Sequence, residues 1–278
     1  MSDRYEGPIR EDNIFVVGCQ RSGTSAVYAG LIAHPDLKQL RPYDPKTGYD
    51  PKELYYFRNI FAARRQFASP MYGWDVDQEY LRRIIDLTVR FCAEHHGAGS
   101  GRWVCAHPMN GLDVSEILET MPNSRVVYVL RHPQEVLWSQ LHAPWVKRQE
   151  SGLEERVSQL ANHWRSFAQI AIEILQSRFG ESVLMVRHEE LVEQTERVSA
   201  KITAHVGVSN DPAVLAQLAG PTFNSSFRDG ASPRKLVAET RQNIAADQNF
   251  CSLVLKHLSR EMEALAYENL RSGSGLAR

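Results

Sequence analysis

Short apolar runs alternate with longer amphipathic stretches along most of this chain. Four of the runs are largely apolar and rich in β-branched or aromatic side chains: residues 14–17, residues 102–108 (which run into a loop), residues 126–130 and residues 183–186. Runs of this length, apolar on both faces and bounded by turn residues, are typical of strands buried within a parallel sheet. We therefore predict four buried strands.

Between these runs the apolar positions recur at helical spacing. The predicted helices cover residues 26–33, 59–68, 80–95, 112–121, 134–141 and 152–179, a segment that ends near residue 206, and residues 243–270. Residues 36–52 and 207–235 are rich in turn-forming residues and are predicted to be mainly loop. Strands that alternate with helices predict a three-layer α/β fold of the P-loop type, with a central parallel sheet flanked by helices.

Composition and charge exclude some classes of function but do not identify one. The 278 residues carry a formal net charge of −1, so no overall positive field attracts nucleic acid or an anionic membrane. No apolar run approaches the roughly 20 residues that span a bilayer, and the four cysteines have no metal-type spacing. We expect a cytoplasmic protein without nucleic-acid or membrane partners, with one domain over residues 13–271, a flexible arm at 1–12 and a tail at 272–278.

The loop after the first predicted strand has the composition of a phosphate-binding loop. Gly18 and Gly23 have the spacing of a Walker A motif, but Thr24 and Ser25 follow where that motif requires Lys and Ser or Thr. A cation, Arg21, lies inside the loop instead. Backbone N–H groups and a helix N-terminus favour a bound anion, so the loop predicts a phosphate site that differs from that of a nucleoside triphosphatase.

Three polar loops are expected to meet at one edge of the sheet. They follow the first three predicted strands and cover residues 18–25, 106–111 and 131–139. Ligands of open parallel sheets bind at the carboxyl ends of the strands. The second loop contains His107, and the third contains Arg131 and, eight residues on, Ser139.

Taken together, these segments resemble the PAPS-dependent sulfotransferases, where PAPS is 3′-phosphoadenosine 5′-phosphosulfate. Residues 19–25 resemble the family's 5′-phosphosulfate loop, and residues 126–139 resemble its 3′-phosphate motif. Residues 227–230 (Phe-Arg-Asp-Gly) resemble the Phe-Arg-Lys-Gly segment of the cytosolic branch. Residues 187–191 (Arg-His-Glu-Glu-Leu) resemble a segment of bacterial members, and the chain looks closer to the heparan- and tyrosylprotein-like branch than to the cytosolic aryl branch.

The resemblance implies a role for each matching residue. Arg21 would face the bridging oxygen of the departing 3′,5′-ADP, and the loop residues would hold the 5′-phosphate. Arg131 and Ser139 would bind the 3′-phosphate, because a guanidinium fork suits a phosphate dianion. The residues so assigned to the nucleotide are Arg21, Ser22, Gly23, Thr24, Ser25, Arg131, Ser139, Arg228 and Gly230. No metal is implied.

The acceptor hydroxyl needs a general base. Residues 53–57 (Glu-Leu-Tyr-Tyr-Phe) resemble the segment that carries the base in heparan-type members, which makes Glu53 the predicted base, with Asp44 and Asp50 as fallbacks. Many members carry a lysine after the second strand, where this chain has Ala106, His107 and Pro108. His107 is predicted to replace that donor or to act as the base itself, and Lys52 is the alternative cation.

Several alternatives remain open from the sequence. The predicted activity is sulfuryl transfer to a hydroxyl of a small molecule, glycan or peptide; the alternatives are a P-loop kinase and a non-catalytic nucleotide-binding protein. Arg58, Arg64 and Arg65 either contact an anionic acceptor or form a solvated helix face, and Phe57 either lines an acceptor pocket or packs in the core. The oligomeric state is not predicted.

Overall fold

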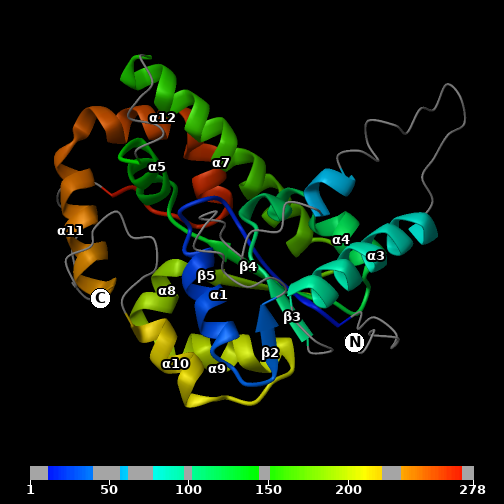
Figure 1. The fold of residues 1–278 in the computed structure, drawn as a ribbon. Coiled ribbons are helices and arrows are strands. Elements are labelled where there is room, and N and C mark those ends of the chain that lie inside the picture. Colours follow the sequence, from blue (N-terminus) through cyan, green and yellow to red (C-terminus); the bar gives the residue numbers. More distant parts are fainter. Residues whose placement is uncertain are drawn as a thin grey trace, which may run out of the picture.

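Five parallel strands form the centre of the molecule. The computed structural model describes residues 12–39, 57–61, 78–96, 102–143, 151–220 and 233–270 (Figure 1). Its sheet has the order β2-β3-β1-β4-β5, and every neighbouring pair is parallel. The strands are β1 (Ile14–Val17), β2 (Leu37–Gln39), β3 (Arg102–Cys105), β4 (Arg125–Leu130) and β5 (Val183–Arg187). The predicted fold class and all four predicted strands are confirmed.

The strand β2 was not predicted. It occupies the start of the stretch expected to be loop, at the edge of the sheet beside β3. Only Leu37 of its three residues is buried. An edge strand with a single buried side chain has no apolar run, so the expectation of a continuous loop from residue 36 was wrong at this point.

The central strands are apolar throughout because both faces of the sheet are covered. In β1 all four side chains are fully buried, with Phe15 and Val17 in one hydrophobic cluster and Ile14 and Val16 in the other. Successive side chains of a strand point to opposite faces. The continuous apolar pattern thus reports two helical layers, one on each side.

The two layers divide the helices between them. The hydrophobic cluster on the first face contains side chains from residues 57–61, α3 (Gln78–His96), α4 (Val114–Thr120), α5 (Pro133–Leu141), α7 (Leu153–Leu175), α11 (Pro233–Ala246) and α12 (Gln248–Ala264). The cluster on the second face contains side chains from α1 (Thr24–Ile32), α8 (His188–Glu193), α9 (Thr195–Val206) and α10 (Pro212–Ala219). Figure 1 shows α7 and α12 together on one side of the sheet and α9 and α10 on the other. A 3₁₀ helix, η1 (Pro108–Leu112), follows β3.

Several predicted helix boundaries were wrong for local reasons. The last predicted helix is two helices, because Asp247 ends α11 and its carboxylate accepts a hydrogen bond from the Phe250 N–H (2.9 Å) to begin α12. The segment ending at residue 206 breaks at Gln194 into α8 and α9. The stretch 207–235 contains α10, and α7 ends at Leu175 rather than at residue 179.

All five strands run in the same direction, so their carboxyl ends share one edge. The loops after β1, β3 and β4 meet there, with β1 between β3 and β4. None of the described helices has an apolar stretch that could span a bilayer. The single domain over residues 13–271 stays a prediction, and the arm and the tail lie outside the described residues apart from Asp12.

Candidate active site

The loop after β1 needs glycine at two positions. Gly18 has φ of +143°, and a Cβ there would lie 2.2 Å from the Val129 carbonyl oxygen of β4. Gly23 has φ of +99°, and a Cβ there would lie 2.6 Å from Cδ2 of His188. L-residues are strained at such φ values, and both contacts are far too short for a carbon atom. The two glycines therefore let the loop lie directly against β4 and α8.

The loop ends in a helix N-terminus suited to an anion. Gly23 is the N-cap residue of α1 and has no side chain to bond the first N–H groups, and the first turn contains no acidic residue. Ser22 is almost fully buried, and its Oγ has no hydrogen-bond partner in the described part of the chain. A buried unpaired hydroxyl beside helical N–H groups is costly unless a ligand bonds to it.

Three of the predicted site residues lie together. Arg21 Nε donates to Ser139 Oγ (2.9 Å) across 118 residues of sequence, and Arg131 Nη1 donates to the Arg21 carbonyl oxygen (3.0 Å). Arg21 has φ of +74°, which is uncommon for a side chain of this size. Burial, and then the charge of Arg131, lower the pKa of Arg21. Two cations held this close favour an anion between or above them.

A buried carboxylate fixes Arg131. Glu135 is fully buried and accepts from Arg131 Nε (2.9 Å) and from Arg241 Nε of α11 (2.6 Å). Burial alone would raise the pKa of Glu135, but the charges of Arg131 and Arg241 outweigh it and hold the pKa at about 2. Glu135 thus keeps its charge at any physiological pH and orients the arginine predicted to bind the 3′-phosphate.

Two further residues complete this side of the site. His188 is buried beneath the loop, and burial together with the Arg131 charge lowers its pKa to about 3. Glu189 Oε1 accepts from the backbone N–H of His132 (2.7 Å), which fixes the turn after β4. Sequence reasoning assigned no role to Glu135, His188 or Arg241. The Arg131–Glu135 spacing of four residues was the available signal; nothing local marked Arg241.

His107 lies at the end of β3, as predicted. It is the N-cap residue of η1 and is almost fully buried. Burial, and then the charge of Arg58, lower its pKa to about 4. His107 is therefore neutral at physiological pH and can donate or accept a hydrogen bond.

Gln20 connects the loop to its surroundings. Its Nε2 donates to Met109 Sδ of η1 (2.9 Å), its Oε1 accepts from His163 Nε2 of α7 (2.5 Å), and its carbonyl oxygen accepts from Gln140 Nε2 of α5 (3.0 Å). Sequence reasoning missed Gln20 and His163, because a contact across 143 residues leaves no local signal. These bonds join the loop to η1 after β3, to the last turn of α5 and to α7 in one polar assembly.

Several predicted residues lie outside the described part of the chain. They are Asp44, Asp50, Lys52, Glu53, Arg64, Arg65, Arg228 and Gly230, and their roles stay predictions. Among the described residues, no group of three or more His, Cys, Asp or Glu side chains could hold a metal ion.

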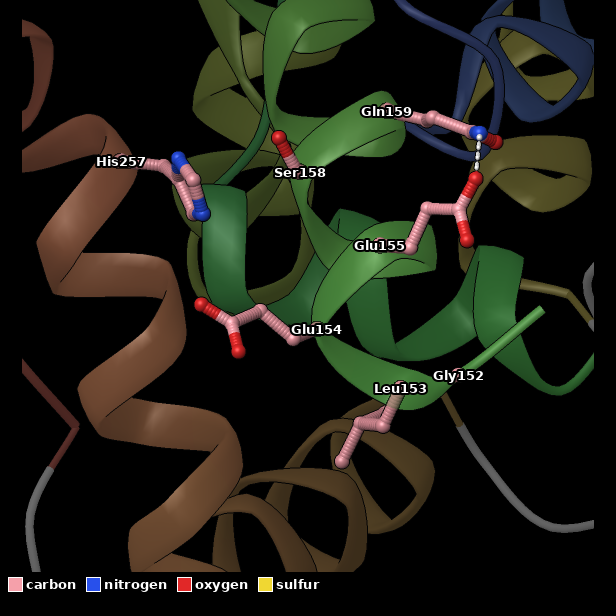
Figure 2. A pocket seen from close by; sticks show the side chains of 7 residues that line it. All are labelled: Gly152, Leu153, Glu154, Glu155, Ser158, Gln159 and His257. Carbon is pink, nitrogen blue, oxygen red and sulfur yellow. Dashed lines mark hydrogen bonds between the residues drawn. The ribbon is translucent and has the colours of Figure 1, made fainter.

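A pocket of about 620 Å³ lies elsewhere in the structure, at the N-terminal end of α7. Figure 2 shows the side chains that line it. It is lined by the first turns of α7 and by His257 of α12. None of the residues predicted to bind the nucleotide or to react lines it. This pocket is thus separate from the polar edge of the sheet.

The comparison with protein families decides what this arrangement belongs to. Residues 13–212, more than half of the chain, match the model of the sulfotransferase family. The chain belongs to the sulfotransferase family. No curated protein sequence matches it, and the specific bacterial branch stays an expectation.

Solved structures, among them two sulfotransferases and a retinol dehydratase, share the fold of this sulfotransferase. The sulfotransferase STF9 from Mycobacterium avium has a TM-score of 0.57 at 11% identity, covering 95% of this chain and 79% of its own. Mouse sulfotransferase SULT7A1 complexed with PAP has a TM-score of 0.54 at 14% identity, with coverage of 94% and 90%. Retinol dehydratase in complex with androsterone and the inactive cofactor PAP has a TM-score of 0.50 at 15% identity, with coverage of 94% and 84%.

Proposed function

We propose that this sulfotransferase moves the sulfuryl group of PAPS to an acceptor hydroxyl. The observation that carries the proposal is the cluster of Arg21, Arg131 and Ser139 beside the N-terminus of α1. PAPS carries a phosphate at its 3′ position and a phosphosulfate at its 5′ position, and the cluster offers cations at two neighbouring places. That two similar folds were crystallised with PAP, the desulfated product, supports the same co-substrate here.

The ligand is placed by matching its charges to the site. The α1 N–H groups and the hydroxyls of Ser22, Thr24 and Ser25 hold the 5′-phosphate. Arg131, oriented by Glu135, and Ser139 bind the 3′-phosphate, with Arg228 and Gly230 as predicted further contacts. Bonds to charged groups contribute about 1.5–3 kcal/mol each, so the 3′-phosphate should separate PAPS from nucleotides that lack it.

The reaction is an in-line displacement at sulfur. The acceptor oxygen forms a bond to sulfur while the bond from sulfur to the bridging oxygen breaks, and its electron pair remains on the 5′-phosphate of 3′,5′-ADP. Arg21 stabilises that developing charge. Preorganised donors aimed at developing charge are usually the largest contribution to such catalysis.

The hydroxyl proton passes to a general base. Glu53 is the proposed base, and His107 is the second candidate, because it is neutral and lies at the end of β3 beside the loop. His107 or Lys52 supplies the remaining polar contact to the sulfuryl group. We propose a small-molecule acceptor before a glycan or a peptide, on the ground that one similar fold binds androsterone.

Ligand binding distinguishes this function from a P-loop kinase. We expect 3′,5′-ADP at 100 times its Kd to stabilise the folded protein by about 2.7 kcal/mol. For a chain of this size, each kcal/mol raises Tm by about 2–4 °C. ATP with Mg²⁺ and AMP are the comparison ligands. A rise with ATP–Mg²⁺ and none with 3′,5′-ADP would overturn the proposal.

Glu53→Gln tests the base. Since Gln keeps the size of Glu but accepts no proton, transfer from labelled PAPS to a panel of acceptor alcohols should fall at least 100-fold. Binding of 3′,5′-ADP should stay within twofold of wild type in calorimetry. His107→Gln is the matched variant: normal turnover in Glu53→Gln with loss in His107→Gln would assign the base to His107.

A further inference from the structure

Cations follow the carboxyl edge of the sheet in a definite order. Arg131 follows β4 and Arg21 follows β1, and β3 lies on the other side of β1. On the proposed function, PAPS lies with its 3′-phosphate above β4 and its 5′-phosphate above β1. The sulfuryl group, which is attached beyond the 5′-phosphate, then extends toward β3. The residues that bind the sulfuryl group should therefore lie beside the end of β3.

Arg58 is fixed on this side of the site by its neighbours in sequence. Phe57 is buried, stacks on Trp103 of β3 (centroids 5.5 Å apart, 17° between planes) and meets Phe15 of β1 edge-on (5.3 Å). Phe61, one turn later, is fully buried. Phe57 thus packs in the core, and its aromatic contacts hold the backbone of Arg58 against β3 and β1.

A buried carboxylate holds the head of Arg58. Nη1 donates to Asp113 Oδ2 (3.0 Å), and the Asp113 side chain is only 1% exposed. Asp113 is the N-cap residue of α4, yet it makes no side-chain capping bond to that helix. An N-cap aspartate ordinarily bonds to the N–H groups of the first turn. This carboxylate is instead directed at Arg58.

One edge of the Arg58 guanidinium remains available. Its side chain is 31% exposed, and Nη1 is the only nitrogen of Arg58 that donates a hydrogen bond within the described ranges. Its charge also reaches the site: after burial, Arg58 is the cause that lowers the pKa of both His107 and His163. His107 lies at the end of β3, and His163 of α7 is bonded to Gln20 of the loop.

We propose that Arg58 is a catalytic residue that binds the sulfuryl oxygens of PAPS, with Asp113 as its positioning residue. The inference rests on the proposed function and adds a third cation to it, after Arg131 on the 3′-phosphate and Arg21 on the bridging oxygen. While the acceptor oxygen bonds to sulfur and the bridging bond breaks, the Arg58 N–H groups bind the non-bridging oxygens of the sulfuryl group and keep it in line.

Arg58→Met tests this with ligands that differ only in the sulfuryl group. Met retains much of the side-chain volume and removes the charge. We expect the variant to bind PAPS about 10- to 100-fold more weakly, as for loss of a bond to a charged group, and to bind 3′,5′-ADP within twofold of wild type. Sulfuryl transfer to water, which needs no identified acceptor, should fall by at least the same factor.

Three further variants accompany it. Arg58→Lys, which keeps the charge, should recover part of the PAPS affinity. Asp113→Asn, which keeps the size of the side chain but removes its charge, should show a smaller loss than Arg58→Met. Arg178→Met is the matched control, because Arg178 pairs with Glu119 on α4 (3.3 Å) but is 74% exposed. It should bind both ligands as wild type does.

The outcomes separate this inference from the proposed function. If wild type binds neither PAPS nor 3′,5′-ADP, the proposed function fails. If wild type binds both and Arg58→Met weakens both equally, or neither, Arg58 has only a structural role and the inference is overturned. If Arg58→Met is too unstable to measure, Arg58→Lys and Asp113→Asn decide. The inference is overturned if Arg58→Lys binds PAPS no more weakly than wild type and Asp113→Asn loses affinity for PAPS and for 3′,5′-ADP by the same factor.

Discussion

Arg131 and Arg58 are both partly buried arginines that bond to a buried carboxylate, one after β4 and the other beside β3. Glu135, the partner of Arg131, is shared with Arg241, and Arg131 donates a second bond to the backbone of Arg21. Arg58 donates one bond, to Asp113, within the described residues. Arg131 is 14% exposed and Arg58 is 31% exposed.

On the proposed function, this difference corresponds to two kinds of anion site. At the β4 end, the charges are fixed by each other before any ligand arrives, which suits an invariant group such as a nucleotide phosphate. Preorganisation lowers the entropy cost of binding. At the β3 end, the cation is fixed at one edge and open at the other, which suits a group that is transferred and must leave.

Glu135→Gln should have the largest effect, because it removes the buried carboxylate that two partly buried arginines share, although Arg241 keeps its 4.0 Å pair with the more exposed Glu193. Breaking one side of a buried ion pair costs about 3–5 kcal/mol, and we expect a fall of about 10 °C in Tm at 2–4 °C per kcal/mol for a chain of this size. Asp113→Asn, which leaves a single and more exposed arginine, should cost less. Thermal unfolding of the two variants compares the two ends directly, and equal losses would contradict the distinction.

Arg131→Ala should have the second largest effect, on the affinity for 3′,5′-ADP. We expect 3′,5′-ADP to bind about 100-fold more weakly, the equivalent of about 2.8 kcal/mol at 1.4 kcal/mol per factor of ten. Binding of adenosine 5′-phosphosulfate, which lacks the 3′-phosphate, should change little. Calorimetry with both ligands is the measurement, and equal losses would show that Arg131 does not bind the 3′-phosphate.

Acidic pH should have the smallest of the three effects, through two neutral histidines. His188 near β4 has a pKa of about 3 and His107 near β3 has one of about 4, both below the usual 6.5. The unfolded chain therefore takes up protons that the folded protein does not, so stability is lost as pH falls below 6.5. For His188 this is about 2 kcal/mol between pH 7 and pH 5.

Denaturant unfolding of His188→Gln at both pH values measures this contribution. The variant should lose about 2 kcal/mol less than wild type between pH 7 and pH 5. His107→Gln should show the same sign and a similar difference, because its pKa of about 4 also lies below this pH range. An unchanged pH dependence in His188→Gln would mean that this histidine is not held neutral in the folded protein.

Local sequence patterns predicted the central strands, the turn glycines and part of the candidate site. Strand β1 is buried on both faces and therefore apolar at every position, and Gly18 and Gly23 mark where the loop turns against β4 and α8. Arg21, Arg131 and Ser139 were predicted in one site, and the structure brings them together. Glu53, Arg228 and Gly230 stay predictions, since they lie outside the described residues.

Other features depended on the tertiary structure. Arg241 meets Glu135 across 106 residues, His163 meets Gln20 across 143, and Asp113 turns from its own helix to Arg58, 55 residues earlier. Strand periodicity, turn glycines and loop composition express interactions between residues a few positions apart, so the sequence by itself determined them. Which distant charges share a buried site depends on the order β3-β1-β4 in the sheet and on the helices packed against it. That order results from the packing of the whole chain, because no short segment contains both partners.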